Sequence, residues 1–251
     1  MTTSTLETSE QTKDTAIVRK GEYSRNGDFH KNLDPNWSYY PVYVNKVRLI
    51  DELLKKNKVS NGRILDLGCG EGVLVEKYAK EGWNIKGIDK NYASPLVQEG
   101  DLTDIPFDDN SIDTMLCLDV LEHLTYLDQG YAMREIKRVI KPNGLLIVSV
   151  PNLAHFTARL KFLFKGRLLR TASISHHPGD RPLMEYEHML GKIGFKTVST
   201  HGIFPTVPPI YRFVRKHPSK SAGLLRWLMH IPFPLSWHFQ TILVGRIQKD
   251  G

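Results

Sequence analysis

The sequence contains little cysteine: Cys69 and Cys117 are the only two among its 251 residues. Two cysteines are too few for a disulfide framework or a cysteine-based zinc site, and they suit a reducing compartment. No apolar run approaches the roughly 18 residues that a membrane span requires. The N terminus also lacks the basic segment followed by an apolar one that marks a signal peptide. These absences predict a cytoplasmic protein.

Acidic residues are scarce in the C-terminal part of the chain. Residues 157–251 hold 15 Lys or Arg and four Asp or Glu, whereas residues 1–156 hold 19 and 23, so the net charge of +7 divides into +11 and −4. Such an asymmetry indicates an anionic partner, a membrane surface or nucleic acid. A solvated basic face explains it equally well, so the charge alone does not choose a partner.

The length of the chain fits one α/β domain with an elaborated cap. Residues 1–20 are polar and rich in Thr, Ser and Glu, which predicts a disordered tail ahead of a single domain over residues 21–251. Short apolar runs then alternate with helical patterns, with strands expected at 63–67, 83–89, 113–120 and 145–150 and helices at 39–56, 72–82 and 127–140. This alternation predicts an α/β, Rossmann-like parallel sheet with helices on both faces.

The pattern is less regular beyond residue 151. Helices are expected at 158–170 and 183–193 and two late strands at 196–204 and 239–249, with a long insertion at 205–238 between the strands. Residues 21–40 and 151–238 are expected to form a cap over the substrate. Their apolar and cationic side chains suit a lid for an apolar or anionic acceptor, or a peripheral contact with a membrane. Core packing of the late strands explains the same residues equally well.

The most informative stretch is 64–72, ILDLGCGEG, which follows a predicted strand and opens a predicted helix. Glycines in such a turn allow a ligand to approach the backbone and the helix N terminus. Carboxylates follow at the ends of the next predicted strands, at Asp89, Asp101 and Asp119. Open parallel sheets bind ligands at that edge, where Asp89 could accept both hydroxyls of a ribose. These residues predict a nucleoside-containing ligand.

The run 65–72 resembles the glycine motif of the class I S-adenosylmethionine-dependent methyltransferases. Further segments are similar to motifs of their small-molecule, ubiquinone-biosynthesis-like subgroup, at 100–107, 111–113, 120–123 and 141–144. The resemblance covers about residues 40–150, the expected cofactor-binding core. It implies a seven-stranded, mostly parallel sheet whose last strand runs antiparallel, and S-adenosylmethionine as the cofactor. The implied activity is methyl transfer to a small-molecule acceptor, for which we expect an oxygen atom.

The resemblance also implies a cofactor role for nine residues at the edge of the sheet. Gly68, Gly70 and Gly72 would line the amino-acid and ribose part of the cofactor, and Asp66 would lie near its amino group. Asp89 would hold the ribose hydroxyls, Asp101 and Leu102 the adenine, and Leu118 and Asp119 the methionyl portion.

Candidates for the acceptor side stand close to these residues in the sequence. His123 is the best candidate for a general base, because imidazole titrates near neutrality, although packing of a helix explains it too. The candidate substrate contacts are Tyr39, Glu122 and His155. Glu122 has no metal-ligand spacing to other residues, so no metal site is expected. His176 and His177 lie in a predicted loop, where paired histidines are usually solvated.

Two other functions fit the same predicted fold. A nicotinamide-dependent oxidoreductase requires a G-x-G-x-x-G loop, but Val73 stands where its third glycine should be. A non-catalytic cofactor-binding protein remains open, as do the oligomeric state and the identity of the acceptor. We expect no nucleic-acid partner, because the chain has no Asn/Asp-Pro-Pro-aromatic sequence at the end of the strand before Asp119. The sequence therefore favours a small-molecule methyltransferase.

Overall fold

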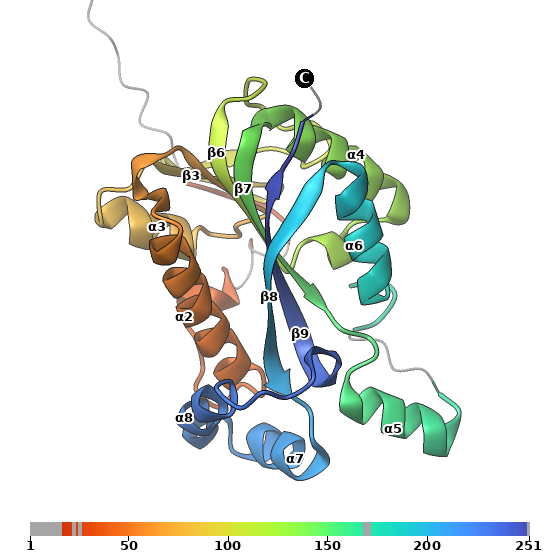
Figure 1. The fold of residues 1–251 in the computed structure, drawn as a ribbon. Coiled ribbons are helices and arrows are strands. Elements are labelled where there is room, and N and C mark those ends of the chain that lie inside the picture. The colour runs from red at the N-terminus through yellow and green to blue at the C-terminus, as the bar shows by residue number, and fades with distance from the viewer. Residues whose placement is uncertain (1–16, 22–23, 25–26, 168–171, 250–251) are drawn as a thin grey trace, which may run out of the picture.

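A seven-stranded sheet forms the centre of the computed structural model, which describes residues 17–21, 24, 27–167 and 172–249. Figure 1 shows helices on both sides of this sheet, whose strand order is β5-β3-β2-β6-β7-β9-β8. The strands are β2 (Ile64–Leu67), β3 (Ile85–Asp89), β5 (Val97–Glu99), β6 (Ile112–Leu118), β7 (Ile140–Pro151), β8 (Phe195–Pro205) and β9 (His238–Ile247). All pairs are parallel except those of β9, which is antiparallel to both neighbours. The predicted Rossmann-like sheet with an antiparallel last strand is confirmed.

The central strands are apolar because both of their faces are covered. All four residues of β2 are buried, and the last eight residues of β7, from Gly144 to Pro151, are buried as well. A strand between two layers of helices reads as a continuous apolar run instead of an alternating one. This explains why the short runs at 63–67 and 145–150 identified these strands from the sequence.

Helices cover the two faces of the sheet and build two separate cores. On one face lie α4 (Tyr126–Val139) and α6 (Leu183–Lys192), whose Ile136 and Tyr186 are fully buried. On the other face lie α2 (Tyr40–Lys56) and α3 (Val73–Lys80), which bury Ile50 and Tyr78. The 3-10 turns are η1 (Phe29–Lys31), η2 (Val59–Asn61), η3 (Leu121–His123) and η4 (Leu235–Trp237). The expected helices at 39–56, 72–82, 127–140 and 183–193 therefore all occur.

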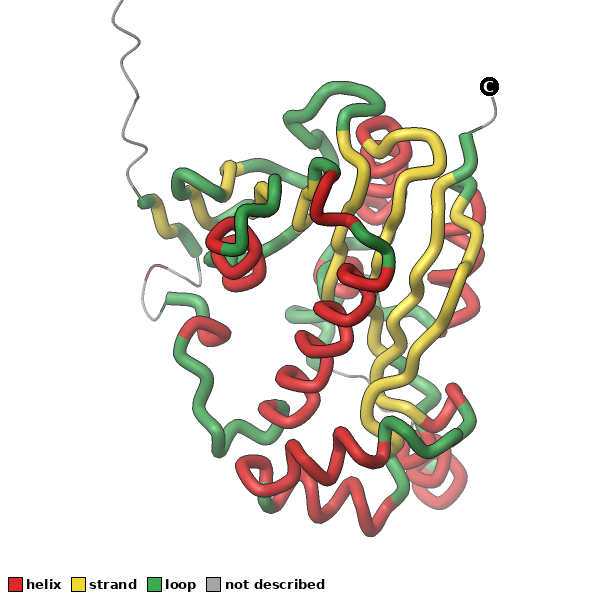
Figure 2. Tube along the Cα trace, turned by 60° about the vertical axis from the view of Figure 1, so that its left-hand side comes forward, coloured by secondary structure: helices red, strands yellow, loops and turns green. Residues whose placement is uncertain are grey.

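The insertion at 205–238 is more regular than the sequence suggested. It folds into α7 (Pro208–Lys216), α8 (Pro218–Leu228) and η4. Both helices begin at a proline, which is favourable at the first helical position because its missing N–H needs no partner there. The Asn45 side chain of α2 donates a hydrogen bond of 3.1 Å to the Ala222 carbonyl of α8. Figure 2 shows these helices gathered at one end of the sheet, beside α2.

Helix α5 (Phe156–Lys165) follows β7 and projects from the body of the protein in Figure 1. It is shorter than the predicted helix at 158–170, because Gly166 adopts a left-handed conformation (φ +60°) and ends it; residues 168–170 lie outside the described part of the chain. Phe162, Leu163 and Phe164 are exposed, so contact with a membrane surface stays a prediction. Of the described helices, none combines the length and the apolar character needed to cross a membrane.

The predicted disordered tail extends too far into the chain. Residues 1–16 lie outside the described residues, but β1 (Val18–Arg19) pairs antiparallel with β4 (Tyr92–Ala93). Arg19 also donates two hydrogen bonds, of 2.7 and 2.9 Å, to the buried carboxylate of Glu71. These partners are more than 50 residues away in the sequence, so the local composition gives no sign of them.

Gly87 in β3 allows the glycine loop to pack against the sheet. A methyl group at this position would lie 2.4 Å from Cys69 Sγ and 3.1 Å from Val75 Cγ2. We expect Gly87→Ala to lower the free energy of unfolding by about 1–3 kcal/mol, because it overpacks this contact. Denaturant unfolding measures the loss, and Cys69→Ala in the same chain should recover part of it.

The control for this prediction is Gly130→Ala in α4, where a methyl group would meet nothing within 4 Å. That variant should keep or raise the stability, because alanine is the better helix former. Wild-type stability of Gly87→Ala would contradict the close packing of the loop.

Candidate functional site

A cleft of about 860 Å³ opens at the carboxyl ends of the parallel strands. Of the candidate residues predicted from the sequence, it is lined by Tyr39, Asp66, Gly68, Gly70, Asp89, Asp101, Leu102, Leu118, Asp119, Glu122 and His123. They come from segments as far apart as α2 and η3, which the parallel sheet brings to one edge. Gly72 and His155 are not among the described residues that line the cleft.

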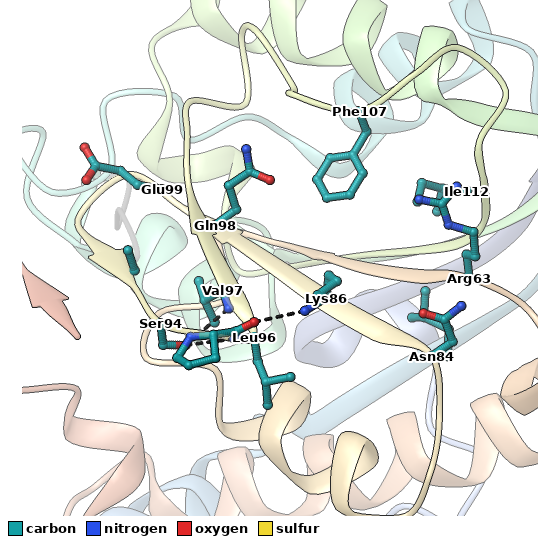
Figure 3. Close-up of a pocket in the computed structure, with 13 residues that line it drawn as sticks. Arg63, Asn84, Lys86, Ser94, Leu96, Val97, Gln98, Glu99, Phe107 and Ile112 are labelled. Carbon is teal, nitrogen blue, oxygen red and sulfur yellow. Dashed lines mark hydrogen bonds between the residues drawn. The ribbon is translucent and has the colours of Figure 1, made fainter. Parts of the chain in front are cut away.

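A second cavity, of about 410 Å³, lies near the amino ends of β2 and β3 and along the edge strand β5. Figure 3 shows Phe107 and Gln98 beside it and the Lys86 ammonium directed at the backbone of the segment before β5. That ammonium donates a hydrogen bond of 2.9 Å to the Pro95 carbonyl. None of the residues predicted from the sequence to form a site lines this cavity, so the larger cleft is the candidate site.

The glycine loop between β2 and α3 depends on left-handed backbone conformations. Gly68, Gly70 and Gly72 have φ values of +63°, +58° and +76°, which residues with a side chain rarely adopt. A methyl group on Gly68 would also lie 2.8 Å from Val120 Cγ2. Gly72 is the N-cap residue of α3, so it sets the start of the helix and does not line the cleft. The loop thus exposes its backbone to the cleft at Gly68 and Gly70.

Asp89, at the end of β3, holds the glycine loop in place. Its Oδ2 accepts a hydrogen bond of 2.9 Å from the Gly70 N–H, and its Oδ1 accepts one of 2.8 Å from the Asn91 N–H. The residue is 6% exposed and lines the cleft. Asp89 therefore supports the loop at a point where its carboxylate also borders the cleft.

Asp66 lies in β2 beneath the loop and is 4% exposed. Burial, reinforced by the nearby charge of Asp89 and opposed by that of Lys46, raises the pKa of Asp66 to about 7. A carboxyl group with such a pKa is held between its neutral and charged forms near neutral pH. A cation bound close to it would favour the charged form.

Asp101 and Leu102 line the far end of the cleft, after β5. Burial raises the pKa of Asp101, but hydrogen bonds from Thr103 and the ion pair with Lys90 outweigh it, and the pKa lies below its ordinary value. The Lys90 ammonium is 2.9 Å from the Asp101 carboxylate. Leu102 is buried beside this charged pair, which gives this end of the cleft one apolar and one anionic wall.

Asp119 follows β6 in a left-handed conformation (φ +57°) and is the centre of a polar network. Its carboxylate accepts hydrogen bonds from the Ser149 hydroxyl, the Gln240 amide and the Lys46 ammonium. Lys46 is 5% exposed although it lies on α2. Lys46 and Gln240 were not among the residues expected from the sequence, because a lysine in an amphipathic helix and a glutamine in a late strand carry no local signal for a site.

Aromatic side chains form the wall of the cleft next to this network. Tyr39 donates a hydrogen bond of 3.2 Å to the Gln240 side chain and packs edge-on against Phe239 and Trp37. All three line the cleft. Burial raises the pKa of Tyr39 well above its ordinary value, and the charges of Asp119 and Glu122 add to that effect. Tyr39 therefore stays a neutral hydroxyl at physiological pH.

Three acid or base groups meet at the other side of the cleft. Glu122 and His123 belong to η3, and His177 comes from the loop before α6. A potential ligand atom from each lies within 4.8 Å of those of the other two. Burial, followed by the charge of Asp119, raises the pKa of Glu122 well above its ordinary value. Here proton transfer, substrate binding and metal binding are all chemically possible.

His155 has a structural position outside the described lining of the cleft, and its predicted contact with the substrate stays a prediction. Its buried side chain caps α5 by accepting a hydrogen bond of 3.3 Å from the Ala158 N–H. The same Nδ1 lies 2.9 Å from the Thr206 hydroxyl. Burial, together with the nearby charges of Lys161 and Arg159, lowers the pKa of His155 to about 4. A neutral, hydrogen-bonded ring at a helix N terminus explains this residue without a substrate.

Known proteins similar to this chain agree with the geometry. A sequence family described as a methyltransferase domain matches residues 37–200. The ubiquinone biosynthesis O-methyltransferase of Actinobacillus pleuropneumoniae is 31% identical over 140 residues, which cover 47% of this chain and 58% of that protein. A probable S-adenosylmethionine-dependent methyltransferase of Mycolicibacterium smegmatis is 28% identical over 151 residues, which cover 56% of this chain and 54% of that protein. The chain thus spans little more than half the length of these relatives.

Two solved structures share the fold. A protein of Pyrococcus horikoshii superposes with a TM-score of 0.55 over 88% of this chain and 99% of its own, at 14% identity. The cyclase SpnF superposes with a TM-score of 0.54 over 80% of each chain, at 18% identity. At such identities the similarity shows the architecture alone. SpnF has this architecture and is named as a cyclase.

The raised pKa of Asp66 predicts a pH-dependent stability. Its folded-state pKa of about 7 lies above that of an unfolded aspartate, so folding takes up a proton at intermediate pH. The free energy of unfolding should therefore fall as the pH rises from about 4 to 7, by up to a few kcal/mol from this group. Asp66→Asn removes the titration and should be the more stable protein at pH 8.

Urea unfolding at pH 5 and pH 8 measures this effect as the difference between Asp66→Asn and the wild type. Asp109→Asn is the control, because Asp109 is exposed and pairs with Arg138 on the surface. The prediction is wrong if the free energy of unfolding changes by the same amount between pH 5 and pH 8 in all three proteins. Asp66 would then be ionised in the folded state at both pH values.

Proposed function

This chain belongs to the methyltransferase domain family, and on that premise we propose that it transfers a methyl group from S-adenosylmethionine to an oxygen atom of a small-molecule acceptor. The observation that carries the proposal is the meeting of two half-sites in one cleft. The glycine loop with Asp89 forms the first, and the cluster of Glu122, His123 and His177 forms the second. A volume of about 860 Å³ has room for a cofactor and a small acceptor.

The residues of the first half-site fit the cofactor. The left-handed glycines leave backbone at Gly68 and Gly70 open to the cleft, as close contact with a ligand requires. Asp89, which lines the cleft and supports the loop through Gly70, would hold the ribose hydroxyls. Asp101 and Leu102 would flank the adenine, which offers an amino group to the carboxylate and a flat face to the leucine.

The charge of the cleft also suits this cofactor. Seven carboxylates and two lysines are found among the described residues that line it. S-adenosylmethionine carries a positive sulfur and an ammonium group, and such charges are favoured where carboxylates are in excess. Asp66 and Asp119 would lie nearest to the methionyl portion, as the family resemblance implies. The same excess favours an apolar acceptor over an anionic one.

The second half-site would act on the acceptor. When bound, the cofactor supplies a methyl group that its positive sulfur has already activated, so positioning is the main task of the protein. A hydroxyl acceptor must also lose a proton. His123 is the proposed base: its Nδ1 lies 2.9 Å from the His176 carbonyl oxygen, which can only accept, so Nδ1 carries the hydrogen and Nε2 the basic lone pair. Tyr39 and Glu122 would orient the acceptor.

Methylation at oxygen is favoured over the alternative of a non-catalytic binding protein. A protein that only binds the cofactor has no need of a proton acceptor beside the second half of the cleft. The relatives named as ubiquinone biosynthesis O-methyltransferases support an oxygen acceptor. The cyclase SpnF, which shares the architecture, illustrates that a fold by itself does not define the reaction.

The first prediction from this proposal concerns Asp89. Asp89→Ala loses the charge-assisted bonds to the ribose, about 2 kcal/mol, and should weaken binding of S-adenosylhomocysteine about thirty-fold. Calorimetric titration measures the affinity. Asp89→Asn, which keeps one acceptor oxygen, should lose less, and the surface variant Asp109→Ala should bind as the wild type does. Unchanged affinity in Asp89→Ala would remove this residue from the cofactor site.

The second prediction concerns His123. His123→Gln should lower turnover at least a hundredfold, because the base is lost, while the affinity for S-adenosylhomocysteine stays the same. Radiolabelled S-adenosylmethionine with a panel of phenols and aliphatic alcohols measures the transfer. The exposed His188 on α6 provides the control, His188→Gln. Near-normal turnover of His123→Gln on an acceptor that the wild type methylates would leave His123 a structural role only.

A further inference from the structure

The three groups at the acceptor side form a set of metal ligands. Glu122 and His123 are neighbours in η3, whereas His177 stands more than 50 residues later in the chain, yet a ligand atom of each lies within 4.8 Å of the other two. We propose that Glu122, His123 and His177 bind one divalent transition-metal ion at the acceptor side of the cleft. Two imidazoles and one carboxylate form a recurrent protein site for zinc and for other first-row metals.

The carboxyl group of Glu122 points to a ligand that is a cation. The residue is 3% exposed, and its Oε2 has no hydrogen-bond partner among the described residues. A buried carboxylate in that position is unfavourable unless a proton or a positive charge neutralises it. The negative charges of Asp119 and Asp180 also disfavour a negative charge on Glu122 and so raise its pKa. An ion on Oε2 would satisfy the open lone pairs and offset this concentration of negative charge.

An oxygen acceptor lies behind each of the two histidine rings. His123 Nδ1 lies 2.9 Å from the His176 carbonyl oxygen, and His177 Nδ1 lies 3.5 Å from the Asp180 carboxylate. The carbonyl can only accept, so His123 Nδ1 carries the hydrogen and its lone pair is on Nε2. The Asp180 carboxylate, which also only accepts, favours the same tautomer of His177. Metal-binding histidines characteristically have such a carbonyl or carboxylate behind the ring, because it fixes the ring and raises its basicity.

The protein also fixes the loop of His177 against η3 without a metal. The Gly179 N–H donates a hydrogen bond of 3.1 Å to the Glu122 carbonyl. The buried Gln129 side chain donates to the Leu121 carbonyl at 2.7 Å and to the Gly179 carbonyl at 2.8 Å. A methyl group on Gly179 would lie 2.0 Å from the Leu124 carbonyl oxygen, so this approach requires glycine. The ligands are therefore largely preorganised.

Binding requires a small contraction of the cluster. Ligand atoms about 2.1 Å from a zinc ion lie about 3.4 Å apart in a tetrahedral site, so the widest pair, which lies within 4.8 Å, must approach by at most about 1.4 Å. Rotation of the exposed His123 ring provides this movement. Three protein ligands leave a coordination position open toward the cleft. With the ion on its Nε2, His123 would no longer be the base. An acceptor hydroxyl bound to the ion would instead lose its proton to water more readily, a use of the ion that rests on the proposed methyl transfer.

Titration with zinc alone tests the site. Full-length protein without a histidine tag is treated with a chelator, dialysed, and titrated with Zn²⁺ in a calorimeter. The wild type should bind one ion per chain, and Glu122→Gln and His177→Ala should each bind it at least tenfold more weakly. The control is His188→Ala, a histidine exposed on α6, which should bind as the wild type does. Substitution of Co²⁺ should give visible absorption bands only where all three ligands are present.

The results that overturn the proposal are specific. It is wrong if the wild type shows no saturable binding of one ion per chain, or if His177→Ala binds zinc as tightly as the wild type. His177→Ala decides the matter if Glu122→Gln fails to fold, because His177 lies in a surface loop. S-adenosylhomocysteine is titrated separately: failure of the wild type to bind it would overturn the proposed function and leave the metal result intact. Full turnover after chelation would limit the ion to a structural role.

Discussion

Parallel pairing of β2 with β3 and β6 is the constraint on which the site depends. Because these strands run in one direction, their carboxyl ends share an edge of the sheet, and the residues that follow them become neighbours. The hydrogen bond from the Gly70 N–H to the Asp89 carboxylate joins the first two strand ends across this edge. Asp119 completes the edge after β6, where a left-handed backbone turns the chain into η3. Without this alignment the glycine loop would have no carboxylate to support it.

The carboxylates gathered at this edge repel one another, and the protein reduces this repulsion in different ways along the cleft. Asp66 has a raised pKa and holds a proton more tightly than an exposed aspartate does. Asp119 is paired with the buried ammonium of Lys46. Glu122 keeps one oxygen without a hydrogen bond among the described residues. At Glu122 the proposed ion would supply a positive charge, as Lys46 does at Asp119. The two cationic groups of the cofactor would likewise offset the negative charge near Asp66.

Segments from both ends of the described chain complete the cleft. The segment before α2 contributes Trp37 and Tyr39, α2 itself contributes Lys46, and β9 contributes Phe239 and Gln240. The packing of α8 against α2 couples the C-terminal insertion to the same helix. The glycine loop and η3 fall within residues 37–200, which the methyltransferase family matches, whereas Phe239 and Gln240 of the cleft lie beyond that range. Such a division explains how one fold supports different reactions.

Local patterns in the sequence were enough for the central strands, the glycine loop and its carboxylates, whereas the seven-stranded sheet with an antiparallel last strand was implied by the family resemblance. Continuous apolar runs such as 145–150 identified buried strands, and three glycines in five residues identified the turn at 68–72, because both depend only on neighbouring residues.

The tertiary structure alone decided the partners of those residues. Lys46, Gln240 and His177 meet Asp119 and Glu122 over separations of 50 to 120 residues, and β1 joins the domain through Arg19 and Glu71. A histidine next to a proline in a loop, or a lysine on a helix, has the same local sequence whether it faces solvent or a buried carboxylate. Its role depends on the strand order and on the packing of distant segments, which local periodicity does not encode.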